Sequence, residues 1–136
     1  MKPVVYTTSF IVFPSHCNHL KEVIFGGAFM AELDLAAAHA VRRALFETTN
    51  GVKNAVTHKA NFTFLKPCYV GDLIELEATI TSVHLKSLTV EVKARRNTNG
   101  VLDDIAEVEF VFISIGDVGD LTLHPKFLPY REHGLV

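Results

Sequence analysis

A single carboxylate lies on the apolar face of a long alanine-rich stretch, seven residues after a glycine pair, and groups of these types can take part in catalysis. The stretch from Ile24 to Phe46 is predicted to be one helix, because alanine, its commonest residue, loses little side-chain entropy in a helix. Gly26 and Gly27 stand at its start, where the first backbone amides lack helical partners and the macrodipole is positive. This end suits an oxyanion, and glycine lets a ligand approach the amides. Asp34 follows Gly27 by seven residues on an apolar face.

The elements that would position these groups are strands, which flank the predicted helix along the chain. Runs of β-branched, aromatic and alternating apolar residues predict strands at residues 6–13, 55–65, 73–83, 88–96 and 105–115. The segment 97–100, Asn-Thr-Asn-Gly, is a hairpin signal. Half-polar strands with tight hairpins predict an antiparallel sheet with one covered face, and the apolar helix is the only element available to cover it. The sequence therefore predicts an α+β fold in which a sheet wraps one helix.

The periodicity also predicts which residues form the core. On the helix, six residues recur at helical spacing: Leu33, Ala37, Ala40, Val41, Ala44 and Leu45. On three strands, alternate apolar residues share one face: Ile74, Leu76, Ala78, Ile80, Leu88, Val90, Val92, Ala94, Ala106, Val108, Phe110 and Phe112.

Length, charge and cysteine content exclude several classes of protein. The 136 residues predict one domain, 1–136, with a tail at 117–136 to which no role is assigned. A net charge of -2 without a basic run argues against nucleic-acid binding. Two cysteines form no disulfide framework, which favours a reducing, cytoplasmic location. The apolar start lacks a signal cleavage site, and no apolar run could span a bilayer, so membrane insertion is not expected.

Two segments carry a resemblance to a known family. They are PSHCNHLKEVIFGGAFMAELDLAAAHA, at residues 14–40, and HKANFTFLKPCYVGDLIELEATITSVHLKSLTVEV, at residues 58–92. From about Tyr6 to Ile115 the chain resembles the hotdog-fold acyl-CoA thioesterases, in particular those that hydrolyse a range of fatty acyl-CoAs. The resemblance implies a hotdog fold, hydrolysis of fatty acyl-CoA to fatty acid and CoA, and a place in lipid metabolism. No cofactor is implied, because CoA is part of the substrate, and no metal is implied.

The family pattern carries over onto specific positions. Asn18 and Asp34 become the catalytic side chains, and the amides at Gly26 or Gly27 polarise the carbonyl. The CoA phosphates or pantetheine have three expected contacts: Lys66, Lys86 and Ser87. This chain departs from the family after the Asn, where Lys and Glu replace a common Gly, and before the fourth strand, where Lys-Ser replaces Thr-Ser.

The chemistry of a thioester explains why these residue types are needed. Backbone amides stabilise the oxyanion, a carboxylate acts as general base or nucleophile, and the Asn18 amide orients water or thioester. Gly27 and Asp34 lie about 10 Å apart along one helix axis, so one reacting carbon cannot contact both. We therefore expect a homodimer with antiparallel helices in which each Asp34 serves Gly27 of the other copy. By analogy with the family, we also expect such dimers to assemble into tetramers or hexamers, the hexamer being preferred.

Each candidate residue also has a simpler interpretation. Asp34 is alternatively a solvated helix acid, and Asn18 a loop or capping residue. The pair Gly26–Gly27 is alternatively only a tight turn.

Other reactive side chains suggest rival sites. Cys17 beside His16 suggests a thiol nucleophile, but neighbours in an extended chain point to opposite sides, which favours a structural Cys. His16 and His19 suggest a metal pair, but no third ligand has a fitting spacing. His39 on the helix is interpreted as a core or interface histidine.

Two other classes of protein stay open. A hotdog acyl-CoA hydratase or dehydratase would act on the acyl chain and would use a His–Asp or His–Glu pair. A non-catalytic acyl-binding module would need the pocket but not Asp34. Only a thioesterase releases free CoA from acyl-CoA.

Overall fold

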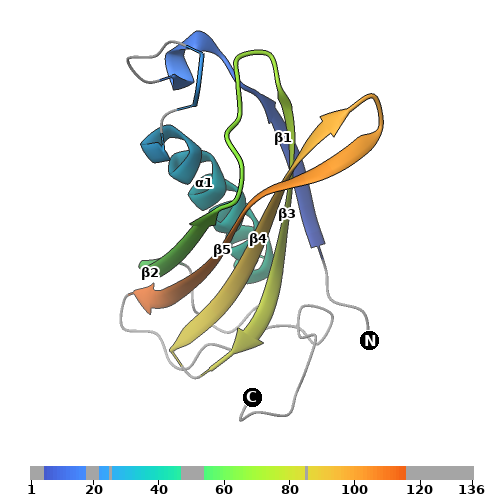
Figure 1. Ribbon diagram of the computed structural model, residues 1–136. Coiled ribbons are helices and arrows are strands. Elements are labelled where there is room, and N and C mark those ends of the chain that lie inside the picture. Colours follow the sequence, from blue (N-terminus) through green and yellow to red (C-terminus); the bar gives the residue numbers. More distant parts are fainter. Residues whose placement is uncertain (1–4, 18–21, 25, 47–53, 85, 116–136) are drawn as a thin grey trace.

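The computed structural model describes residues 5–17, 22–24, 26–46, 54–84 and 86–115 (Figure 1). The elements along the chain are β1 (Val5–Ile11), a 3-10 turn (Pro14–His16), α1 (Gly26–Phe46), β2 (Asn54–Phe64), β3 (Leu73–Val83), β4 (Ser87–Thr98) and β5 (Val101–Ile115). The strands form one antiparallel sheet in the order β1-β3-β4-β5-β2, and α1 lies along one face of it. This is the predicted α+β arrangement of a hotdog fold.

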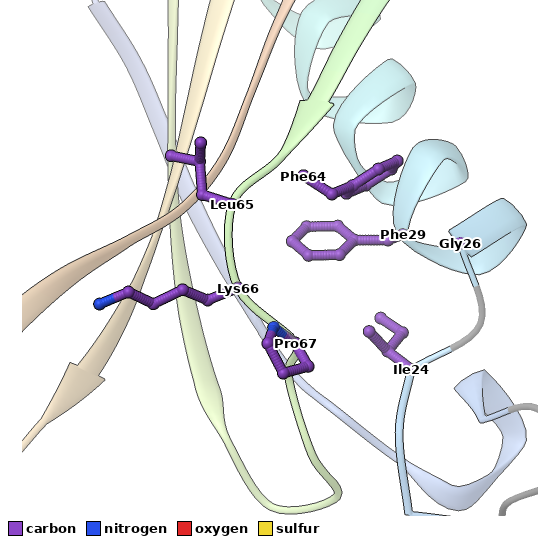
Figure 2. A pocket seen from close by; sticks show the side chains of 7 residues that line it. All are labelled: Ile24, Gly26, Phe29, Phe64, Leu65, Lys66 and Pro67. Carbon is purple, nitrogen blue, oxygen red and sulfur yellow. The ribbon is translucent and has the colours of Figure 1, made fainter.

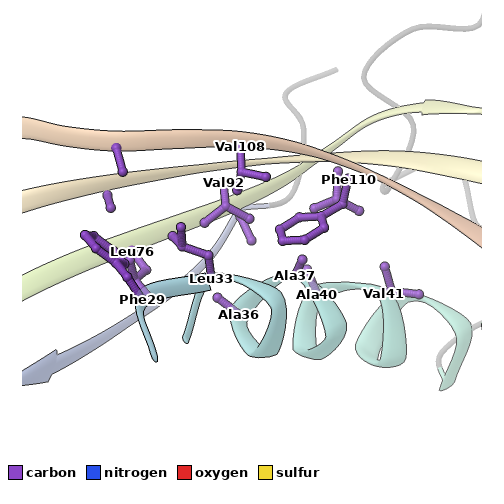
Figure 3. Packing of buried hydrophobic residues seen from close by; sticks show 14 of the residues in the cluster. Phe29, Leu33, Ala36, Ala37, Ala40, Val41, Leu76, Val92, Val108 and Phe110 are labelled. Carbon is purple, nitrogen blue, oxygen red and sulfur yellow. The ribbon is translucent and has the colours of Figure 1, made fainter. Parts of the chain in front are cut away.

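The core lies between α1 and the sheet, as the periodicity predicts. All the strand residues named as core positions are at most 3% exposed, and Leu33, Ala37 and Ala44 are fully buried. The predicted Ala40 and Val41 are also buried, and the side chain of Leu45 lies outside the described part of the structure. Phe29 and Ala36 of α1 join them, and Figure 3 shows the helix side chains packed beneath the strands. Small residues dominate this face of α1, so the helix axis approaches the sheet closely.

The hairpin between β4 and β5 is built by the predicted turn residues. Asn99 and Gly100 have positive φ angles of 53° and 89°, which is typical of a two-residue type I′ turn. The Asn97 Oδ1 accepts the Gly100 amide at 2.8 Å. Because the turn continues both strands, β4 and β5 extend further toward it than the sequence predicts.

Two predicted elements extend two residues beyond the observed ones, for reasons of backbone hydrogen bonding. The helix begins at Gly26, because the backbone of Ile24 instead bridges to Cys17 and donates to the Cys68 carbonyl at 2.9 Å. The first strand ends at Ile11, because Val12 already exchanges hydrogen bonds with the turn before β3.

The strand β2 lies at one edge of the sheet and pairs there with β5. Its register shifts between Thr57 and Lys59, which leaves His58 as a bulge residue. Most of its described side chains are exposed, and Figure 1 shows α1 beside it. This edge, beside the helix, is where the candidate site lies. Within the described residues, no helix is both long enough and apolar enough to cross a membrane.

Candidate active site

A cavity of about 280 Å³ opens in the groove between α1 and the edge strand β2. Four of its lining residues come from one face of α1, and four come from the sheet: Gly27, Met30, Ala31, Asp34, Thr57, Ala60, Phe62 and Phe110. The helical residues follow the spacing i, i+3, i+4, i+7, which places Gly27 and Asp34 on the same face. The cavity is apolar except for one carboxylate and one hydroxyl.

The carboxylate of Asp34 is half-buried and held by a short hydrogen bond. The Thr57 Oγ1 donates to Asp34 Oδ1 at 2.7 Å. A hydroxyl bonded to a carboxylate at this distance makes a charge-assisted bond, which fixes the rotamer of Asp34. Thr57 is not among the predicted site residues, because a Thr in a strand predicts only a strand. The bulge after Thr57 became evident only with the register of β2.

A second cavity of about 240 Å³ lies in the same groove at the start of α1 (Figure 2). Its lining residues are Ile24, Gly26, Phe29, Phe64, Leu65, Lys66 and Pro67. A Cβ added at Gly26 would meet nothing within 4 Å, so the space over this residue is open. Since the first amides of a helix have no helical acceptor, this opening gives a ligand oxygen access to them.

Both backbone amides of the segment after β2 in the wall of this second cavity, and the Pro67 carbonyl, are already engaged. The amides of Leu65 and Lys66 both donate to the Ile105 carbonyl, at 2.8 and 3.2 Å. The Pro67 carbonyl accepts from Arg96 at 3.3 Å, and proline has no amide hydrogen. Beyond the helix start, the wall therefore offers no unpaired backbone amide from Leu65 or Lys66.

An ion-pair network backs this wall. Arg96 donates to Asp103 at 3.0 Å and to Asp72 at 3.3 Å, and the Lys66 Nζ lies 2.7 Å from Asp103. Asp72 also accepts the Tyr69 amide at 2.8 Å. Hydrogen bonds from Lys66 and Arg96 lower the pKa of Asp103, and the bond to Asp103 raises the pKa of Arg96. The network ties the segment after β2 to the β4–β5 hairpin.

The comparisons with known proteins assign the family. The model of the thioesterase superfamily matches residues 21–102, which is more than half of the chain. The chain belongs to the thioesterase superfamily. A search of curated protein sequences gives no match.

Solved structures agree with this family. An acyl-CoA hydrolase from Staphylococcus aureus, in complex with butyryl-CoA, CoA and CoA disulfide, is 25% identical, with a TM-score of 0.71, over 88% of this chain and 71% of the other. A hexameric thioesterase from Yersinia pestis is 21% identical, with a TM-score of 0.73, over 88% of this chain and 97% of the other. The PaaI protein from E. coli is 19% identical, with a TM-score of 0.68, over 87% and 76%. The predicted fold and the predicted family of thioester hydrolases are thereby confirmed.

In this member of the thioesterase superfamily, some predicted site residues come together and others do not. Gly27 and Asp34 line one cavity, and Gly26 lines the next. Asn18 lies outside the described residues, as does His19. The catalytic roles of Asp34, Asn18 and the glycine amides stay predictions.

The three predicted CoA contacts lie in two separate places in one protomer, Lys66 in one and Lys86 with Ser87 in the other. The Lys66 ammonium is paired with Asp103 near the β4–β5 hairpin, and its side chain points away from the cavity in Figure 2. Ser87 begins β4, nine residues from Arg96, so roughly 30 Å of strand separates the two ends. Lys86 precedes Ser87 and is exposed. Lys66 and Ser87 therefore do not form one cluster within a protomer.

Two histidines of the described residues, His16 and His39, have side-chain partners in the protein. The His16 Nδ1 accepts the Phe13 amide at 2.9 Å, and its Nε2 lies 3.4 Å from Glu32. The His39 Nδ1 lies 3.1 Å from the Tyr6 hydroxyl. His39 is exposed in the protomer, so its interpretation as a core histidine was wrong, and that of an interface histidine stays a prediction. His16 thus holds the turn before α1 against the helix.

The two cysteines have structural surroundings. The Cys17 thiol donates to the Phe13 carbonyl at 3.5 Å. Cys68 is fully buried, and burial raises the pKa of its thiol to about 12, so it is not a thiolate at neutral pH. Neither thiol lines the two cavities.

Proposed function

We propose that this protein hydrolyses the thioester of acyl-CoA, releasing a fatty acid and CoA. The observation that carries the proposal is the Asp34 carboxylate, fixed by Thr57 in a cavity that also contains Gly27 at the start of α1. A positioned carboxylate of one copy, facing the unpaired helix amides of the other copy, fits acyl transfer to water. The superfamily and the CoA-bound hydrolase from Staphylococcus aureus support the same reaction.

The roles follow from the chemistry of each group. The acyl carbonyl accepts hydrogen bonds from the amides at Gly26 and Gly27, which stabilise the oxyanion. Asp34 takes a proton from water as the water oxygen attacks the carbonyl carbon, or it attacks directly to give a mixed anhydride that water then cleaves. In both routes the carbon–sulfur bond breaks and the CoA thiolate leaves. Asn18 orients the water or the thioester.

A second copy of the chain completes this site in the proposal. Gly27 and Asp34 are seven helical residues apart, about 10 Å, so the two groups of one reaction centre come from different copies. The edge of β2 next to the groove and the exposed apolar side chains of Met30 and Val56 favour a partner there. Pairing of two β2 edges about a two-fold axis makes the neighbouring helices antiparallel. Assembly of such dimers into a hexamer is proposed from the Yersinia pestis relative.

Variants of the Staphylococcus aureus hydrolase offer a parallel. Three of its structures carry alanine in place of an Asn, an Asp or a Thr. These are the residue types of Asn18, Asp34 and Thr57. We propose that the three residues of this chain act together, with Thr57 holding Asp34.

Release of free thiol from acyl-CoA tests the function. We expect hydrolysis of butyryl-CoA or a longer acyl-CoA, and a loss of about 100-fold or more in kcat for Asp34→Asn. The matched control is Glu32→Gln, which changes a carboxylate on the same helix that contacts His16 instead of the cavity. Full turnover in Asp34→Asn would disprove the site assignment.

The same assay separates the alternative classes. An acyl-binding module would bind acyl-CoA without releasing thiol. A hydratase would change the acyl chain and keep the thioester. No histidine is among the described residues that line either cavity, so the structure does not favour the hydratase.

A further inference from the structure

Two aromatic rings divide the groove between α1 and β2 into its two cavities. Phe62 lines the cavity of Asp34, and Phe64 lines the cavity at the helix start. They are two residues apart on β2 and project from the same face. Their rings are nearly parallel, with an interplanar angle of 6° and centroids 6.0 Å apart. The stacked pair therefore separates one groove into two compartments.

Phe64 extends this partition from the strand to the helix. Its ring lies 5.6 Å from the ring of Phe29, which projects from α1 (Figure 2). Phe29 is 2% exposed and belongs to the core, whereas Phe64 is 43% exposed. Of these two rings, only that of Phe64 can be removed without opening a hole in the core.

The cavity at the helix start suits a hydrocarbon chain. Ile24, Phe29 and Pro67 supply its apolar surface, and the wall amides are engaged elsewhere, as described above. The Lys66 ammonium is held by Asp103. The two amides of pantetheine would find few partners here, whereas an acyl chain bound through its carbonyl at Gly26 would meet apolar walls.

We propose that Phe64 sets the limit on acyl chain length by closing the apolar cavity toward the rest of the groove. The inference rests on the proposed function and adds a specificity-determining residue to it. Each cavity, at about 240 and 280 Å³, is smaller than the roughly 300–1,000 Å³ of pockets that hold drug-sized ligands. The two cavities joined would fall within that range. The chain as it stands thus prefers short acyl groups.

Phe64→Ala tests the proposal across a series of acyl-CoAs. The series runs from butyryl- through octanoyl- and dodecanoyl- to palmitoyl-CoA, with kcat and KM measured for each by thiol release. We expect kcat/KM for palmitoyl-CoA relative to butyryl-CoA to rise about tenfold or more in Phe64→Ala. Each methylene group newly buried changes binding by roughly fourfold, so a few are sufficient. Phe64→Leu, which keeps much of the bulk, should shift the ratio less.

The matched control is Phe10→Leu. Phe10 contacts Phe29 from β1, with ring centroids 6.0 Å apart, but lines neither cavity. It should lower the thermal stability without changing the order of preference among the acyl-CoAs. A thermal melt of each variant identifies effects that come from unfolding alone.

The results that would overturn this inference differ from the result that would overturn the proposed function. An unchanged chain-length profile in Phe64→Ala would overturn the inference. A KM raised equally for every acyl-CoA would also overturn it, because the cavity would then hold the CoA arm. If the parent protein releases no thiol from any acyl-CoA, the proposed function itself fails.

Discussion

The two flanks of α1 differ in what their side chains face, which is the packed core on one flank and a cavity on the other. The flank toward the centre of the sheet is closed, with Leu33, Ala37 and Ala40 at most 8% exposed against the strands (Figure 3). The flank toward β2 is open, with Gly27 and Asp34 lining a cavity. One helix thus builds the core with one side and leaves the other for a ligand and a second copy. The neighbours Leu33 and Asp34 belong to different flanks, the first buried in the core and the second lining the cavity, so substitutions there test the comparison directly.

The largest expected effect is on catalysis at the open flank. Asp34→Asn should lower kcat by about 10²–10⁴-fold, because the amide can neither take a proton nor attack. Its free energy of unfolding should change by no more than about 1 kcal/mol, since the side chain is not part of the core. Thiol release and urea unfolding on the same sample measure both quantities. Strong destabilisation would show that this flank is part of the core after all.

At the closed flank we expect a loss of stability without a loss of catalysis. Leu33→Ala should lower the free energy of unfolding by about 2–5 kcal/mol, because it leaves a cavity beneath the sheet. The fraction that remains folded should keep its kcat, since Leu33 lines neither cavity. Urea unfolding gives the first value, and activity at low temperature gives the second. A selective loss of kcat with normal stability would contradict the separation of the flanks.

A smaller effect is expected at Thr57. Thr57→Val keeps the shape but removes the donor to Asp34, and should lower kcat about tenfold with little change in KM. Thr57→Ser, which restores the hydroxyl, should recover most of the rate. The control is Thr63→Val, which changes a Thr on the same strand that pairs opposite Glu107. Equal rates for the Val and Ser variants at position 57 would show that the hydroxyl does not position Asp34.

The smallest effect is expected at the ion pairs behind the apolar cavity. Because Lys66 and Arg96 lower the pKa of Asp103 in the folded protein, these bonds stabilise it above the ordinary aspartate pKa of about 3.9. That stabilisation is lost as the pH falls through the lowered value. Asp103→Asn should therefore be less stable than the parent at pH 7, and the difference should shrink in acid. Urea midpoints across this pH range measure it, and a constant difference would contradict the assignment. Solvent screening keeps the effect small.

The sequence alone determined the parts of this protein that depend on short-range periodicity. Alternation predicted the buried face of β3 and β4, and helical spacing predicted the core face of α1. The Asn-Gly pair predicted its hairpin, because few other residues tolerate the positive φ angles of that turn. The resemblance added the family, which the comparisons confirm.

Only the tertiary structure decided which groups meet across the chain. The pairing of Thr57 with Asp34 depends on a bulge and a strand register, and neither leaves a local pattern. The engagement of Lys66 by Asp103 depends on where a hairpin folds back, and it removed this ammonium from the wall of the cavity. The partition by Phe62 and Phe64 depends on the width of the groove between the helix and the edge strand. Local patterns assign a residue to a face, but contacts between distant segments arise only when those segments pack.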